Sequence, residues 1–177
     1  QRGGYGEISA ARVFEVSSNV GIVKLIRKHY DDKPEKFLKH LKEYGLTEKI
    51  GLPIKGEGKP TFYYPGKPGW SKISLEWMSW GYGIAITPLQ TLTLYNAVAN
   101  NGVMVKPQFI KELRKENRIK KTVKTEILNP QIASPETIKK LKKVLENVVV
   151  KGTASTIYSP NFSMAGKTGT AKKFIGK

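Results

Sequence analysis

The stretch whose side chains are best suited to binding or catalysis lies near the end of the chain. It reads Ala165-Gly166-Lys167-Thr168-Gly169-Thr170-Ala171. An alternation of apolar residues leading into it predicts a strand over residues 162–171. Glycine packs nothing within a strand and is favoured where another backbone approaches closely. A lysine ammonium and threonine hydroxyls beside bare backbone suit an extended, anionic, peptide-like ligand that docks as an added strand. A glycine-containing turn on a basic surface is the other interpretation of this stretch when it is taken alone.

A second group of small polar residues, Ser17-Ser18-Asn19, interrupts two helical patterns over residues 8–30. Serine and asparagine favour a turn or a helix start there, because their side chains bond nearby backbone groups. The triplet is therefore either a plain cap for a helix over 20–30 or a hydroxyl and an amide held at a helix junction. The two histidines, His29 and His40, occupy surface-like helix positions, so a serine nucleophile here depends on lysine chemistry.

The order of these groups resembles that of a known family. Ser17-Ser18-Asn19 matches S-x-N and Lys167-Thr168-Gly169 matches K-T-G, which are motifs of serine β-lactamases and penicillin-binding proteins. Further stretches that fit class B penicillin-binding proteins are residues 80–90, 97–102 with 106–107, and 150–154. The resemblance covers nearly the whole chain and is greatest to the cell-division (septal) peptidoglycan D,D-transpeptidases. It implies an α+β, β-lactamase/transpeptidase-like fold, with an antiparallel sheet flanked by helices and a helical subdomain.

The resemblance also implies roles for the matching side chains. It places catalytic roles on Ser17, Asn19 and Lys167, and substrate binding on Thr168, Gly169 and Thr170. Ser17 relays a proton to the leaving nitrogen, Asn19 orients the nucleophile's lysine and the substrate amide, and Lys167 holds positive potential beside Ser17. The threonines flank the substrate carboxylate, and the backbone N–H of Thr170 supplies one half of an oxyanion hole. The family implies no cofactor and no metal.

One family motif has no match in the chain. No serine is followed by a lysine three residues on, so the S-x-x-K motif that carries the family's nucleophile is absent. We therefore expect residues 1–177 to be a partial transpeptidase domain, incomplete at both ends, without the upstream S-x-x-K segment or the final strands and helix. This chain alone is then not acylated by β-lactams, whereas a longer parent is. An unpaired edge along residues 162–171 further predicts a homodimer or strand exchange.

Composition bears on partners and location. The formal net charge is +17, from 31 basic and 14 acidic residues, with no cysteine. Lysine dominates and is spread over helix faces, and no helix-turn-helix, zinc-finger or RRM signature occurs, so we expect no nucleic-acid partner. The resemblance implies peptidoglycan stem peptides, β-lactam antibiotics and divisome membrane proteins as partners. It also implies a periplasmic, extracytoplasmic position at the inner membrane, with the anchor outside this chain.

Three other functions are compatible with these motifs. A serine β-lactamase shares them, although the long separation of Ser17 from Lys167 and the Thr87-Pro88-Leu89-Gln90 segment favour a transpeptidase. A β-lactam sensor domain uses the same fold for binding and signalling. A catalytically inactive division scaffold is the third alternative, and the intact Ser17, Asn19 and Lys167 argue against it.

Local patterns also predict the elements between the motifs. Pro34 starts a helix that Gly45 ends, and Ser134-Pro135 begins a long helix. Residues 103–128 suggest a hairpin around Glu116-Asn117-Arg118. Thr87, Pro88 and Gln90 form a capping box for a helix to about Asn100. The side chains expected to face inward on that helix are Leu92, Tyr95, Val98 and Ala99.

Overall fold

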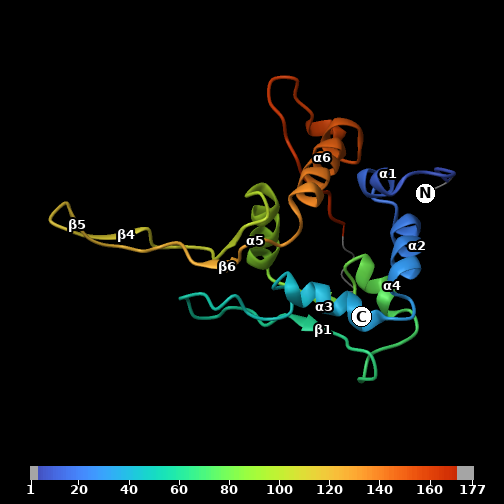
Figure 1. Cartoon of the computed structure of the whole chain (residues 1–177), viewed down its shortest axis with the longest axis horizontal. Helices are drawn as coiled ribbons and strands as arrows, with labels where there is room; N and C mark the ends of the chain where they lie inside the picture. The colour runs from blue at the N-terminus through green and yellow to red at the C-terminus, as the bar shows by residue number, and fades with distance from the viewer. Residues whose placement is uncertain (1–3, 171–177) are drawn as a thin grey trace, which may run out of the picture. The chain divides into compact units, whose positions relative to one another are not determined.

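The computed structural model describes residues 4–170, so Ala171 lies outside the described part of the chain. Its elements, drawn in Figure 1, are α1 (Ala10–Glu15), α2 (Asn19–Tyr30), α3 (Pro34–Glu43), β1 (Thr61–Phe62), α4 (Ser74–Ser79), β2 (Ile84–Ala85), α5 (Pro88–Ala99), β3 (Met104–Val105), β4 (Glu112–Lys115), β5 (Arg118–Thr122), β6 (Ile127–Asn129), α6 (Pro135–Lys151) and the 3₁₀ helix η1 (Ser155–Ile157). They divide into two compact units. Of the described residues, the first unit contains 4–38, 62–85 and 140–170, and the second contains 39–61 and 86–139.

The first unit begins with two helices joined at the Ser17-Ser18 turn. The Ser9 hydroxyl accepts a hydrogen bond from the Arg12 N–H at 3.2 Å, and the Ser18 hydroxyl accepts one from the Gly21 N–H at 3.2 Å. Each helix therefore has a side-chain cap at its start. A Cβ at Gly21 would lie 2.6 Å from the Val13 methyls, so glycine permits the close crossing of α1 and α2. The predicted pair of helices hinged at residues 17–19 is confirmed.

The core of the first unit is built from several helices. Its buried apolar side chains are Val13, Val16, Leu38, Leu75, Met78, Leu145, Val148 and Val149. Val148 and Val149 of α6 are 0% and 2% exposed, so this part of α6 lies at the centre of the core. The predicted start of α6 is also confirmed, because the Ser134 hydroxyl accepts a hydrogen bond from the Thr137 N–H at 3.2 Å.

The second unit is organised around α5. The predicted capping box is present, with Thr87 and Gln90 bonding each other's backbone N–H groups. The Gln90 amide is 2% exposed and donates to the carbonyl oxygens of Leu46 at 3.1 Å and Glu48 at 2.8 Å. These bonds hold the chain that follows α3 against α5. Helix α5 also contacts β3, which pairs antiparallel with β6.

The inward face predicted for α5 is wrong at three of its four positions. Leu92 and Tyr95 are 60% and 39% exposed, and Ala99 is exposed too, whereas Val98 is buried as expected. The buried positions include Gln90, Thr93 and Ala97. Polar side chains can occupy this face because their groups are bonded, as the Thr93 hydroxyl is to the Leu89 carbonyl at 2.7 Å.

The strands of residues 4–170 pair only in twos. They form the sheets β1–β2, β3–β6 and β4–β5, so the α+β class is confirmed but a larger antiparallel sheet is absent from the described residues. The hairpin predicted around residues 116–118 is β4–β5, and Glu116 and Asn117 take the positive φ values of its two-residue turn. No helix in this part of the chain combines the length and apolar character needed to cross a bilayer.

The strand predicted over residues 162–171 is not formed in residues 162–170, which have no regular secondary structure. A strand needs a ladder of backbone hydrogen bonds to a neighbour. Here the Gly166 N–H instead donates to the Leu145 carbonyl of α6 at 3.2 Å. The alternation of apolar residues is real, but in the described chain the side of α6, rather than a strand, lies against it.

Candidate active site

The Ser17-Ser18-Asn19 triplet provides more than a helix cap. Ser18 caps α2, whereas Ser17 has φ +53°, in the left-handed region that residues with a side chain seldom occupy. A non-glycine residue in this region costs energy and is found often at functional sites. Ser18 is thus the plain helix cap, and Ser17 is the hydroxyl held at the junction of the two helices.

Lys167 lies directly against that turn. Its ammonium donates to the Ser17 hydroxyl at 2.8 Å and to the Thr168 carbonyl oxygen at 3.0 Å. It also lies 5.6 Å from the centre of the Phe14 ring, which is a favourable cation–π distance. Partial burial lowers the pKa of Lys167 from its ordinary value, because the charged form loses solvation there. A lysine with a lowered pKa that touches a serine hydroxyl is suited to moving a proton through that hydroxyl.

A cavity of about 930 Å³ in the first unit opens beside this pair. Its lining includes all six residues singled out in the sequence, namely Ser17, Asn19, Lys167, Thr168, Gly169 and Thr170. Trp80 and Tyr82 contribute aromatic surface to the same cavity. Among the residues that the structure describes, a Cβ placed on Gly166 or Gly169 would meet nothing within 4 Å, so packing against this part of the chain requires glycine at neither position. The bare backbone is thus open to a ligand, as the sequence pattern suggested.

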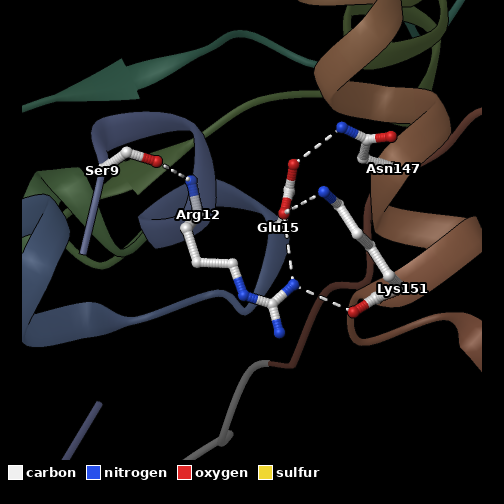
Figure 2. A network of polar contacts seen from close by, with 5 residues as sticks. All are labelled: Ser9, Arg12, Glu15, Asn147 and Lys151. Atoms are coloured by element: carbon white, nitrogen blue, oxygen red, sulfur yellow. Dashed lines mark hydrogen bonds and ion pairs between the residues drawn. The ribbon is translucent and has the colours of Figure 1, made fainter. Parts of the chain in front are cut away.

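A polar network joins the two halves of the site from behind, and Figure 2 shows its centre. The buried Glu15 carboxylate, 3% exposed, accepts hydrogen bonds from the Asn147 amide at 2.8 Å and the Arg12 guanidinium at 3.1 Å. Arg12 also donates to the Lys151 carbonyl at 2.9 Å, and the Lys151 ammonium lies 4.0 Å from Glu15. The end of α1 is therefore tied to the end of α6.

The network continues toward the K-T-G residues through Thr153. The Thr153 N–H donates to the Glu15 carbonyl at 3.1 Å, and its hydroxyl shares a 2.6 Å hydrogen bond with the Thr168 hydroxyl. Glu15 stands two residues before Ser17, and Thr168 follows Lys167. One chain of bonds thus connects the backbone of both motifs.

Burial disfavours the charge on Glu15, yet its environment keeps the carboxylate ionised. Hydrogen bonds from Asn147 and Arg12, together with the charges of Lys151 and Arg12, outweigh that burial and lower the pKa of Glu15. The site therefore combines a buried negative charge, on Glu15 at the end of α1, with the partly desolvated ammonium of Lys167, which lines the cavity.

Comparison with known proteins identifies the family. Residues 1–177 match the family described as the penicillin binding protein transpeptidase domain. This chain belongs to that family. Relatives include Stage V sporulation protein D of Bacillus subtilis, 32% identical over 98% of this chain and 26% of that protein. The peptidoglycan D,D-transpeptidase FtsI of Escherichia coli is 28% identical over 96% of this chain and 26% of that protein.

The folds agree as well. A crystal structure of penicillin-binding protein 3 from Mycobacterium tuberculosis, in complex with aztreonam, superposes with a TM-score of 0.78 at 29% identity. The match covers 93% of this chain and 37% of the other. The chain spans about a quarter of the length of the curated relatives it matches.

The sequence alone did not point to the residues that support this candidate site. Residues 150–154 were noted only as part of the family resemblance. No role was predicted for Arg12, Glu15 or Asn147. Glu15 stands between the apolar Phe14 and Val16 at the end of α1. This apolar context was the one signal in the sequence that could have predicted its burial. Its partner Asn147 is 132 positions away, and no local pattern could have found it.

Proposed function

We propose that this chain supplies part of the active site of a peptidoglycan D,D-transpeptidase that β-lactams acylate. One observation carries the proposal. The Lys167 ammonium lies 2.8 Å from the Ser17 hydroxyl, across 150 positions of sequence, in a cavity that Asn19 and residues 168–170 also line. Membership of the family supports the reaction class, which is transfer of an acyl group through a serine ester.

The proposed roles follow the geometry. Ser17 passes a proton to the leaving nitrogen, and Lys167 then donates a proton to Ser17. The Lys167 ammonium also gives the site a positive potential that attracts a substrate carboxylate. Asn19 orients the lysine beside the nucleophile and the substrate amide. Thr168 and Thr170 contact the carboxylate over the open backbone at Gly169, and the Thr170 N–H donates to the developing oxyanion.

The nucleophile is a further part of the proposal. No serine here has a lysine three residues on, so we place the attacking serine in a segment outside these residues. That serine loses its hydroxyl proton and its oxygen forms an ester with the stem-peptide carbonyl as the amide C–N bond breaks. The leaving amine takes up a proton relayed by Ser17. The amine of a second stem peptide then attacks the ester carbonyl and forms a new amide bond, and its proton returns to the serine oxygen as the C–O bond breaks.

Labelling with a fluorescent penicillin, read by intact mass, tests these statements. A longer protein that joins this chain to its S-x-x-K segment should gain one penicilloyl group, and the 177-residue chain should gain none. In the longer protein, Lys167→Ala should slow acylation by about 10²-fold or more. Lys139→Ala, at an exposed lysine on α6, should leave the rate unchanged.

Each alternative gives a different result in the same assay. Rapid release of hydrolysed penicillin indicates a β-lactamase, and a stable adduct without any cross-linking of stem peptides indicates a sensor. Absence of an adduct on the longer protein refutes the transpeptidase and leaves an inactive scaffold. An adduct on the 177-residue chain refutes the placement of the nucleophile.

We further propose that the parent acts in cell division, at the extracytoplasmic face of the membrane, with divisome membrane proteins as partners. The septal character of the motifs supports this assignment. Depletion of the parent in growing cells should block septa and produce filaments. Loss of rod shape, or a defect confined to sporulation, would contradict it. Sedimentation of the purified 177-residue chain tests the homodimer or strand exchange predicted along residues 162–171, and a monodisperse monomer would contradict it.

A further inference from the structure

The β4–β5 hairpin of the second unit has an uneven distribution of charge. Residues 111–124 contain seven basic and two acidic side chains. All of them are exposed except Glu112, which is half-buried, and Figure 1 shows the two strands as a long ribbon. The pairing register assigns each side chain to one face of this ribbon.

Residues that pair directly across an antiparallel ladder share a face. Glu112 pairs with Thr122 and Arg114 with Ile119, whereas Leu113 pairs with Lys121 and Lys115 with Arg118. The Val123 N–H donates to the Lys111 carbonyl at 2.9 Å, which continues the ladder by one step. Alternation along β4 then puts these pairs on two opposite faces. A register shift between Leu113 and Arg114 leaves Lys120 outside the pairs.

The two faces differ in charge. On one face, Arg114 is paired with Glu112 at 2.7 Å beside Ile119 and Thr122, so that face is neutralised internally. The other, which we call the cationic face, presents Lys111, Lys115, Arg118 and Lys121 around Leu113 and Val123. Within residues 4–170, none of its four cations forms an ion pair with a carboxylate. Like charges left together on an exposed sheet are unfavourable without a counter-charge.

We infer that the cationic face binds a polyanionic polymer, namely the carboxylate-bearing peptidoglycan itself, through residues other than those of the candidate active site. The choice of polymer rests on the proposed function. Long lysine side chains suit an irregular array of carboxylates, because each is a flexible point charge. Such a surface holds the polymer while the catalytic cavity acts on one of its stem peptides.

Two other polyanions fit the hairpin less well. Membrane-surface elements carry a broad stripe of large apolar side chains with aromatic residues among them, whereas the cationic face carries only Leu113 and Val123, and Ile119 lies on the opposite face. Single-stranded nucleic acid stacks on aromatic side chains, and residues 111–124 contain none.

The test is co-sedimentation of the whole chain with purified, insoluble peptidoglycan sacculi at low and moderate salt. Lys115→Glu with Lys121→Glu changes the cationic face. Lys55→Glu with Lys59→Glu, at two exposed lysines of the second unit outside the hairpin, is the control with the same change in net charge. The first pair should weaken binding about tenfold or more, and the control less than about twofold. Salt should weaken the wild-type binding because both partners are exposed to solvent.

Two outcomes overturn the inference. Equal loss in both variants shows a diffuse attraction due to net charge alone. Undiminished binding to sacculi whose carboxylates have been converted to amides shows that carboxylates are not the ligand. Vesicles of phosphatidylglycerol and phosphatidylcholine are the comparison, and binding to them in place of sacculi would assign the face to membranes. Penicillin labelling is unaffected by any of these results, so a failure of this inference is distinct from a failure of the proposed function.

Discussion

Replacing Glu15 by glutamine measures how far the junction of α1 and α6 depends on one buried charge. Glutamine keeps the shape of the side chain, and its remaining oxygen can still accept the hydrogen bond from Asn147. The change removes the charged hydrogen bond to Arg12 at 3.1 Å and the attraction to Lys151 at 4.0 Å. It also turns an amide N–H₂ group toward a guanidinium, and two donors then face each other.

The size of the effect follows from exposure. A hydrogen bond to a charged group contributes about 1.5–3 kcal/mol to stability. The Arg12 side chain is 36% exposed, so solvent screens part of its interaction with the 4% exposed Glu15 side chain. We expect Glu15→Gln to lower the free energy of unfolding by about 2 kcal/mol, which corresponds to roughly 4–8 °C in Tm for a chain of this size.

The pH dependence gives the prediction its sign. Because the pKa of Glu15 is lowered in the folded chain, its contribution is fully present above the unfolded value of 4.5. It is lost as the pH falls through the folded pKa. The difference between wild type and Glu15→Gln should therefore be constant at pH 6–8 and shrink steadily below about pH 4.5.

Urea unfolding of the whole chain, followed by tryptophan fluorescence at several pH values, measures this difference. Glu146→Gln is the control, because the Glu146 side chain is 30% exposed and pairs with Lys143 on the surface. It should cost less than about 1 kcal/mol. A Glu15→Gln variant as stable as wild type at pH 7 would refute the reasoning, as would a difference that does not change down to pH 3.

Three further predictions concern the same site. Thr153→Val should slow penicillin acylation of the longer protein about tenfold and speed amide exchange at residues 168–170, because Thr168 loses its 2.6 Å partner. Thr153→Ser should restore both, and equal behaviour of the two variants would show that the hydroxyl has no positioning role. Gly152→Ala should destabilise the chain by about 3 kcal/mol, since a Cβ would lie 2.7 Å from Val148 Cα and against the Glu15 carbonyl; unchanged urea unfolding would contradict this. NMR titration of lysine side chains should show one group, absent in Lys167→Arg, that titrates below 10.5. Since the unfolded state holds that proton more tightly, stability should rise with pH as Lys167 deprotonates, and a flat profile there would count against its burial.

Local chemistry decided which parts of the fold were predictable from sequence. The Thr87–Gln90 capping box, the Ser18 cap and the turn at Glu116-Asn117 each depend on bonds within a few residues, and all three are present. The strand over residues 162–171 depended on a distant ladder partner that the described residues do not supply.

The candidate site divides in the same way. The residues that line the cavity could be predicted, because Ser17, Asn19 and Lys167 belong to short motifs that occur in a known order. The supports behind it could not, since the Glu15–Asn147 and Thr153–Glu15 bonds join residues more than 130 positions apart. The error on α5 has a related cause, because Gln90 and Thr93 are buried through hydrogen bonds that hydrophobic patterning does not register.

The interrupted path of the first unit has a consequence for how the protein is made. Its three stretches are separated by the whole of the second unit, and Ser17 meets Lys167 only across 150 positions. Closing so long a loop costs about 4 kcal/mol of chain entropy. On a ribosome adding roughly 5–20 residues per second, the turn at Ser17 waits about 8–30 s for Lys167 to be synthesised. For most of that interval the Glu15 carboxylate is also without Asn147. The nascent α1 and α2 therefore exist for seconds without the α6 contacts that hold the Ser17 turn in the finished protein.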